Sequence, residues 1–367
     1  MSASLSPRAK QTFQTVSLLA TVMVVGIHYR SVTCDSDLLS HATANQLSQE
    51  FLLGGIARVA VPMFAFAAGL FYFQSFNGTW ACYWKKLQQR IRSVAFPYFM
   101  IASVAIVFWL SVKKWEGEVV QLSFSQLLSM WWLRPPVEQL WFLRDLMVLV
   151  LIAPIVSLVA HRLRQTGLVV VALLWFGEIQ PFPHVAGWYL LNNETLLFFT
   201  LGCAATKRTD LLEQICQLPV SVKFGLFVAW MGLALGRTLM QPNFDLWYVS
   251  QYSWTSLWLQ KLSITVGCVA FFAVASQVHS VWVSQWSGAA FFVYLVHEFP
   301  LRAILIKLAD RVLPTPIQFW FTFPAVVILC FALAMLLNRW APAVLALFTG
   351  GRTPDSAMRI VRTAPAP

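Results

Sequence analysis

The sequence "VMVVGIHYR", residues 22–30, closes an apolar run with a histidine, a tyrosine and an arginine. The run starts near residue 12, and a membrane helix needs about 20 mostly apolar residues. The rest of the chain is similar, because 58% of its 367 residues are hydrophobic and only 11% are charged. A soluble domain has about 25% charged residues. The sequence therefore predicts an all-α, polytopic transmembrane helix bundle.

Ten segments are apolar enough to be membrane spans. They are residues 12–30, 54–74, 94–112, 140–160, 167–179, 190–206, 224–240, 261–277, 288–306 and 319–338. The fifth is the shortest, and every later helix reverses direction if it does not cross. The end of the chain, "GGRTPDSAMRIVRTAPAP", has a composition typical of disorder. We therefore expect one transmembrane domain over residues 1–345 and a disordered cytoplasmic tail over 346–367.

The lysines and arginines predict the orientation. With the N-terminus inside, fifteen of them lie in cytoplasmic connections and tails and seven lie outside. Basic residues collect on the cytoplasmic side of membrane proteins, so we expect both termini inside. This also explains the net charge of +11 without a nucleic-acid partner. The six cysteines form no CxxC or Cys/His pair, and no metal site is predicted.

Several ionisable residues fall inside the apolar segments. They are His28, Arg58, Arg144, Asp145, Glu194, Arg237, His297, Glu298 and Arg302. Such residues are costly at membrane depth and are functional candidates by default, although some reach the interface from helix ends. Lys10 and His28 are 18 residues apart, or about 27 Å along a helix, so His28 lies near the outer face. Similar counting places the other residues at that level, which predicts a polar cavity open to the outside.

A second polar feature lies on the inner side. The stretch "KKLQQRIR" carries Lys85, Lys86, Arg90 and Arg92 just before the third span. Clustered lysine and arginine side chains suit phosphate groups. An ordinary positive-inside loop would have the same composition.

Six stretches together resemble the acyltransferase-3 family of integral membrane O-acyltransferases. They are "VMVVGIHYR", "VPMFAFAAGLFYF" (61–73), "RIRSVAFPYF" (90–99), "QLWFLRDLMVLVLIAP" (139–154), "LLFFTLGCAATK" (196–207) and "FFVYLVHEFPLR" (291–302). The resemblance is carried by their order over nearly the whole chain. It implies about ten helices and the acylation of polysaccharides, lipid-linked sugars or similar glycans.

The resemblance also implies a mechanism. His28 matches the family's catalytic histidine, acyl-CoA enters from the cytoplasm, and the acceptor comes from the outer side. Many members carry an arginine or lysine eleven residues before that histidine, whereas this chain has Ser17. The role of that arginine or lysine in other members is therefore not carried over to Ser17.

The residues themselves suggest the chemistry. A histidine titrates near neutral pH and can take the proton of a hydroxyl. We expect His28, His297 and Glu298 to be catalytic, with Asp145 or Glu298 orienting an imidazole. Arg58, Arg144 and Asp145 are candidates for binding the oxyanion or the acceptor. Lys85, Lys86, Arg90 and Arg92 would hold the acyl-CoA phosphates.

The predicted function is O-acylation, most simply acetylation, of an exported glycan or lipid-linked sugar in a bacterial inner membrane. Acyl-CoA would be a co-substrate, and no tightly bound cofactor is expected. A polytopic secondary transporter is the main alternative, but transporters commonly show repeats, and none is visible. A membrane scaffold or sensor leaves the shared depth of the polar residues unexplained. A polyprenyl-linked sugar transferase is a further alternative. Such an enzyme would be expected to carry paired acidic residues in a long outer loop near the first helix.

Overall fold

The protein is an assembly of helices, which confirms the predicted all-α class. The computed structural model describes residues 5–30, 43–182, 184–185, 188–247, 250–278 and 280–352. Within these residues, only β1 (His184–Val185) and β2 (Trp188–Tyr189) are strands, and they pair antiparallel in one short hairpin. Residues 353–367 lie outside the described residues, so disorder there stays a prediction. Residues 346–349 belong to a helix (Pro342–Thr349), so the disorder expected for them was wrong.

The first half of the described chain contains fourteen helical segments. They are α1 (Pro7–Ile27), α3 (Ala44–Gln49), η1 (Glu50–Gly55), η2 (Ile56–Val59), α4 (Ala60–Phe73), α5 (Trp80–Arg90), η3 (Ile91–Ala95), α6 (Phe96–Trp115), α7 (Phe124–Trp132), η4 (Glu138–Leu140), α8 (Trp141–Leu151), α9 (Ala153–His161), α10 (Arg164–Phe176) and α11 (Asn193–Ala205). Among them η1 and η3 are π-helical, and η2 and η4 are 3-10 helices.

The second half contains three long helices, α13, α14 and α18, and a break between α16 and α17. The segments are α12 (Thr209–Gln217), α13 (Val220–Met240), α14 (Trp254–Ala275), α15 (Val281–Ser287), α16 (Ala290–Val296), η5 (His297–Arg302), α17 (Ala303–Ala309), α18 (Thr315–Trp340) and α19 (Pro342–Thr349). Each of the ten predicted spans therefore contains helix.

Fewer than ten helices meet the length and hydropathy of a membrane span on their own. In the described residues five do, and a sixth is obtained if the bent pair of η4–α8 and α9 counts as one span. The outer faces of α13 and α18 are apolar, since Phe224, Val228, Phe321 and Ile328 are exposed. Apolar surface of this extent faces lipid rather than water. The protein is thus an integral membrane protein, while the number of ten spans and the N-in orientation stay predictions.

Two predicted spans are interrupted, and proline explains both breaks. Residues 140–160 form α8 and α9, which meet at an angle of 72°, with Pro154 in the first turn of α9. Residues 288–306 form α16 and α17 with the π-helical η5 between them, where Phe299 is extended and Pro300 follows. Proline lacks an N–H and disfavours helical dihedrals in the residue before it. The continuous helix expected over 288–306 was therefore wrong.

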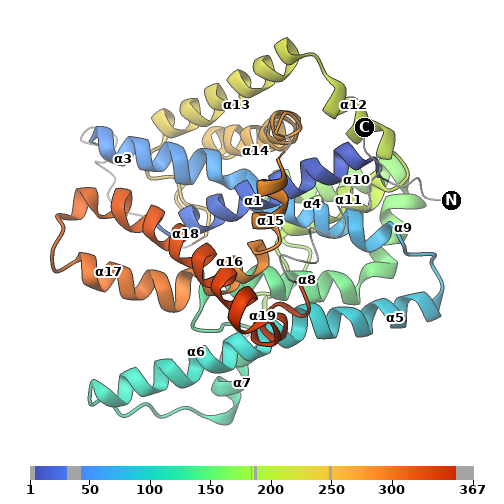
Figure 1. Cartoon of the computed structure of the whole chain (residues 1–367). Helices are drawn as coiled ribbons and strands as arrows, with labels where there is room; N and C mark the ends of the chain where they lie inside the picture. Colours follow the sequence, from blue (N-terminus) through green and yellow to red (C-terminus); the bar gives the residue numbers. More distant parts are fainter. Residues whose placement is uncertain are drawn as a thin grey trace.

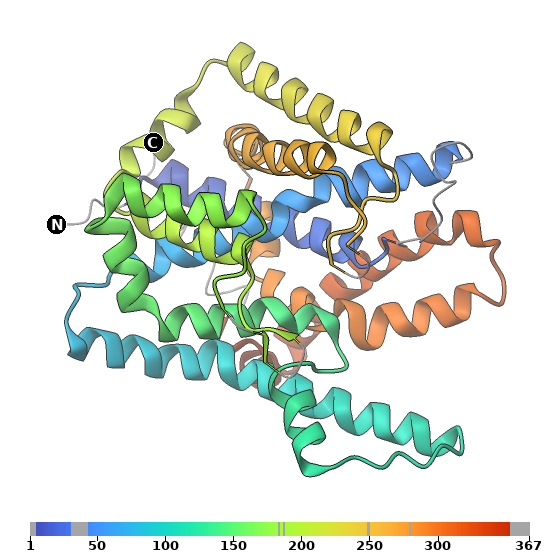
Figure 2. The ribbon, with the colours of Figure 1, turned by 180° about the vertical axis from the view of Figure 1, so that it is seen from behind.

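Helix α1 runs through the interior of the bundle. It packs against α4, α14, α15, α16 and α18. Figures 1 and 2, which view the molecule from opposite sides, both place α13 at one edge and the α6–α7 pair projecting at another. The start of α1 is defined by Ser6, whose side chain accepts the Ala9 N–H, and by Pro7 in the first turn.

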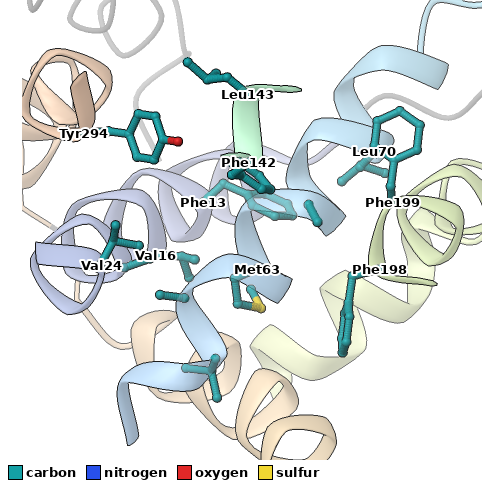
Figure 3. Packing of buried hydrophobic residues seen from close by; sticks show 14 of the residues in the cluster. Phe13, Val16, Val24, Met63, Leu70, Phe142, Leu143, Phe198, Phe199 and Tyr294 are labelled. Carbon is teal, nitrogen blue, oxygen red and sulfur yellow. The ribbon is translucent and has the colours of Figure 1, made fainter. Parts of the chain in front are cut away.

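Helices α4 and α11 touch backbone to backbone. A Cβ at Gly69 would collide with the carbonyl oxygen of Phe199, and one at Gly202 would collide with that of Phe66. Glycine at such crossings lets membrane helices approach closely. Figure 3 shows side chains of α1, α4 and α11, such as Phe13, Met63 and Phe198, packed in this region.

Alanine at Gly69 or Gly202 should destabilise the protein. The added methyl group must push the two helices apart, and overpacking of this kind costs about 1–3 kcal/mol. Gly225 on α13 is the matched control, because a Cβ there meets nothing within 4 Å and alanine favours helix by up to about 1 kcal/mol. Thermal unfolding in detergent would contradict this packing if all three variants melted alike.

Candidate active site

His28 lies at the end of α1 beside two residues that are distant in sequence. It is the C-cap residue of that helix. Its ring centroid is 5.0 Å from that of His297, and its Nδ1 is 3.7 Å from Oε2 of Glu298. The structure therefore brings together the three residues that the sequence analysis singled out as catalytic.

The break at η5 presents His297 and Glu298 to His28. His297 is fully buried, and its Nδ1 lies 3.1 Å from the Val293 carbonyl oxygen and 2.9 Å from that of Tyr294. A nitrogen between two carbonyl oxygens carries the proton, so Nε2 of His297 has the free lone pair. Within the described part of the chain this Nε2 has no hydrogen-bond partner.

Glu298 is held from several sides. Its Oε2 accepts the backbone N–H of Gln139 at 3.1 Å, and its Oε1 lies 4.0 Å from Nη1 of Arg302. Gln139 is fixed in turn, because its side-chain Nε2 donates to the Leu295 carbonyl oxygen. The carboxylate that faces His28 is therefore positioned by η4 as well as by its own helix.

Glu138 is a neighbour that the sequence analysis missed. Ligand atoms of His28, Glu138 and Glu298 lie within 4.8 Å of one another, a spacing that a divalent cation can accept. Glu138 is exposed, while His28 and Glu298 are partly buried, so the group is open to solvent. Its position just before the fourth predicted span would have been the available signal, but a single acid outside the apolar segments did not stand out.

Arg58 lies on η2 within electrostatic range of His28, Glu50 and Glu194. It is partly buried. A guanidinium there can stabilise negative charge near the imidazole. Of the two predicted arginine candidates for the oxyanion, Arg58 is the one with an electrostatic influence on His28, where Arg302 has the larger influence.

Arg144 and Asp145 bind each other and nearby backbone rather than the histidines. Both are buried, with Nη2 of Arg144 at 3.0 Å from Oδ1 of Asp145. Arg144 also donates to the Leu133 carbonyl oxygen, and Asp145 accepts the backbone N–H of Asn192. The pair therefore ties α8 to the end of α7 and the start of α11, and its predicted role in acceptor binding remains untested.

Arg30, two residues after His28, belongs to a buried ion-pair network. Glu50 is bonded by Nε of Arg30 at 2.7 Å and also by Nη1 of Arg237. Arg30 also reaches Oδ1 of Asp245 at 3.8 Å and donates to the Phe244 carbonyl oxygen. By sequence alone, Arg30 and Glu50 counted as charges of an outer connection. The network joins the end of α1 to η1 and α13, and so it holds His28 in place.

The side chains of the four residues in the predicted phosphate cluster do not converge on one site. Lys85 and Arg92 are exposed, and Lys86 donates to the Tyr72 carbonyl oxygen and to Oγ of Ser75. Only Arg90 among the four lines a cavity with a volume of about 500 Å³.

That cavity is mostly apolar. Its lining includes Ser17 on α1, Phe142 on α8, Phe199 on α11 and Tyr294 on α16. Figure 3 shows the last three side chains on their separate helices. The Tyr294 ring lies 6.2 Å from that of His297, which places one part of the lining beside the histidine group.

Comparison with known proteins identifies the family of the chain. A family model described as an acyltransferase domain matches residues 18–339. The chain belongs to this acyltransferase family. It is also similar to the succinoglycan biosynthesis protein ExoH of Rhizobium meliloti (strain 1021), with 24% identity over 356 residues and 92% of each chain covered. No solved structure matches the chain.

The family assignment confirms the resemblance on which the sequence analysis relied. The matched range of this membrane acyltransferase contains His28, Arg58, Arg90 and the η5 segment, but Arg352 lies beyond it. The roles of the individual residues rest on the geometry described above.

Replacing Glu50 with alanine should strongly reduce stability. Two arginines would then be buried without their carboxylate, and removing one partner of a buried pair costs about 3–5 kcal/mol. Glu116→Ala is the control, since Glu116 forms an exposed pair with Lys113 at 3.2 Å and such pairs contribute little. Equal melting temperatures for the two variants would mean that the network does not hold the end of α1.

Proposed function

We propose that this acyltransferase moves an acetyl group from acyl-CoA in the cytoplasm to a hydroxyl group of an exported glycan or lipid-linked sugar. The observation that carries the proposal is the meeting of the partly buried His28 and Glu298 with the buried His297. The similarity to a succinoglycan biosynthesis protein supports a polysaccharide acceptor. The proposed setting is a bacterial inner membrane with both termini inside.

The first step is general-base catalysis. A hydroxyl group of the acceptor gives its proton to the imidazole of His28 as its oxygen attacks the thioester carbonyl carbon. Glu298, 3.7 Å from Nδ1 of His28, stabilises the imidazolium that forms, as a carboxylate does in hydrolase triads. The ring of His297, whose centroid is 5.0 Å from that of His28, packs against the imidazole.

The second step is collapse of the tetrahedral intermediate. The carbon–sulfur bond breaks, the imidazolium returns its proton to the departing sulfur, and the products are an ester and free CoA. Arg58 is proposed as the guanidinium that stabilises the oxyanion, since it lies on η2, which packs against α1. No external oxidant, reductant or additional proton source is needed.

Alanine at His28 should abolish transfer while leaving the protein in the membrane. Loss of a general base lowers rates by about 10²–10⁴-fold. The measurement is transfer of labelled acetyl from acetyl-CoA to the glycan in isolated membranes, with the acceptor analysed by mass spectrometry for an added acetyl group. His184→Ala is the control, since His184 is an exposed histidine on β1. Full activity of the His28 variant would refute the proposed base.

Removal of metal ions should not change the rate. The proposed steps use imidazole, carboxylate and guanidinium groups, although His28, Glu138 and Glu298 have the spacing of metal ligands. Membranes are treated with EDTA and assayed before and after addition of Mg²⁺ or Zn²⁺. A loss of transfer that either ion restores would replace the general base by a metal-bound nucleophile or Lewis acid.

A further inference from the structure

The end of α19 is fixed against the segment that carries the basic cluster. Gly350 ends the helix with a left-handed backbone (φ 61°), and a Cβ there would lie 2.5 Å from Cα of Ser93 and 2.9 Å from the Arg92 carbonyl oxygen. Glycine is thus required both by the dihedral angle and by the close approach. The contact docks residues 349–352 onto η3.

This docking places Arg352 in the wall of the apolar cavity. Its guanidinium stacks on the ring of Phe291 at 4.2 Å, and its carbonyl oxygen accepts the Thr349 hydroxyl. Arg90, from the end of α5, lines the same cavity. Among the described residues of the lining, these two are the charged ones.

The two guanidinium groups lack a protein anion. Arg90 and Arg352 repel each other electrostatically, and no carboxylate of the described chain is paired with either. Burial and, secondarily, the nearby Arg90 lower the pKa of Arg352 to about 10, so it stays charged at neutral pH. A guanidinium pair of this kind suits a phosphate or pyrophosphate group.

We propose that Arg90 and Arg352 form a phosphate-binding mouth to the cavity, and that the docked end of α19 builds it. This inference rests on the proposed function, because it identifies the ligand as the phosphate-bearing end of acyl-CoA. The apolar walls between this mouth and Tyr294 then take the uncharged arm of the donor. Ser17 lines the cavity and precedes His28 by 11 residues, or about 16 Å of helix.

The test is CoA binding, measured by calorimetry on the full chain in nanodiscs of phosphatidylcholine. Arg352→Gln should weaken CoA binding by about tenfold or more, since hydrogen bonds to charged groups contribute about 1.5–3 kcal/mol. Binding of pantetheine, which carries no phosphate, should not change. Arg352→Lys should recover part of the affinity, and Arg208→Gln, which alters an exposed arginine, should bind CoA like the wild type.

A second variant tests the geometry without removing a charge. Gly350→Val should displace the end of α19 and weaken CoA binding as Arg352→Gln does, with the melting temperature measured in parallel to establish that the bundle is folded. Equal CoA affinity in wild type and Arg352→Gln would overturn the inference. A wild type that binds no CoA at all would instead refute the proposed function, whereas His28→Ala should bind CoA normally and fail only in transfer.

A lipid headgroup also carries a phosphate group. A further binding experiment therefore distinguishes a lipid from CoA as the ligand. The binding measurement is repeated in nanodiscs containing phosphatidylglycerol, with retained lipid identified by native mass spectrometry. The donor assignment predicts CoA binding that depends on Arg352 in both lipids. Retention of phosphatidylglycerol that depends on Arg352, together with CoA binding that does not, would overturn it.

Discussion

The constraint on which the site depends is the fixed end of α1 against the broken helix that follows α16. Arg30, two residues after His28, is held by buried Glu50, and Glu50 is held by Arg237 on α13. From the other side, the break at Pro300 lets η5 turn His297 and Glu298 toward α1. Buried ion pairs add little net stability but become costly when one partner is lost, so they specify a single arrangement here. The imidazole of His28 is thereby held where a carboxylate, a second imidazole and solvent all reach it.

The polar end of the bundle and the apolar cavity suit opposite parts of the proposed reaction. In the proposed reaction, Arg90 and Arg352 hold the charged nucleotide of the donor, and its uncharged arm lies between the aromatic walls of the cavity. Helical backbone satisfies its own hydrogen bonds in lipid, and the two breaks in the helices lie at η5 and between α8 and α9. Irregular backbone is thus used where functional side chains are needed, and regular helices such as α13 and α18 face the lipid.

The class of fold was predictable from the apolar composition, and the meeting of His28, His297 and Glu298 was predictable because an α-helix has a fixed rise per residue. Counting residues from Lys10 placed His28 near one face, and the same counting brought His297 and Glu298 to that level. Pro300 was visible in the sequence, yet composition alone favoured a continuous span over 288–306. The ion pairs were harder to foresee, because Arg30, Glu50 and Arg237 come from distant segments that only the folded chain brings together. Arg352 was assigned to the tail, since the docking of Gly350 on Ser93 depends on a close backbone approach that residue types do not reveal.

The central claim is that His28 and Glu298, 270 residues apart, act as one catalytic unit. A double-mutant cycle on the transfer rate tests it most directly, with His28→Ala, Glu298→Gln and the double variant compared in the same membranes. Residues that act together are strongly non-additive. If His28 and Glu298 act as one unit, the double variant is no slower than His28→Ala alone. Losses that multiply, so that Glu298→Gln lowers the residual rate by the same factor as it lowers the wild-type rate, would contradict it.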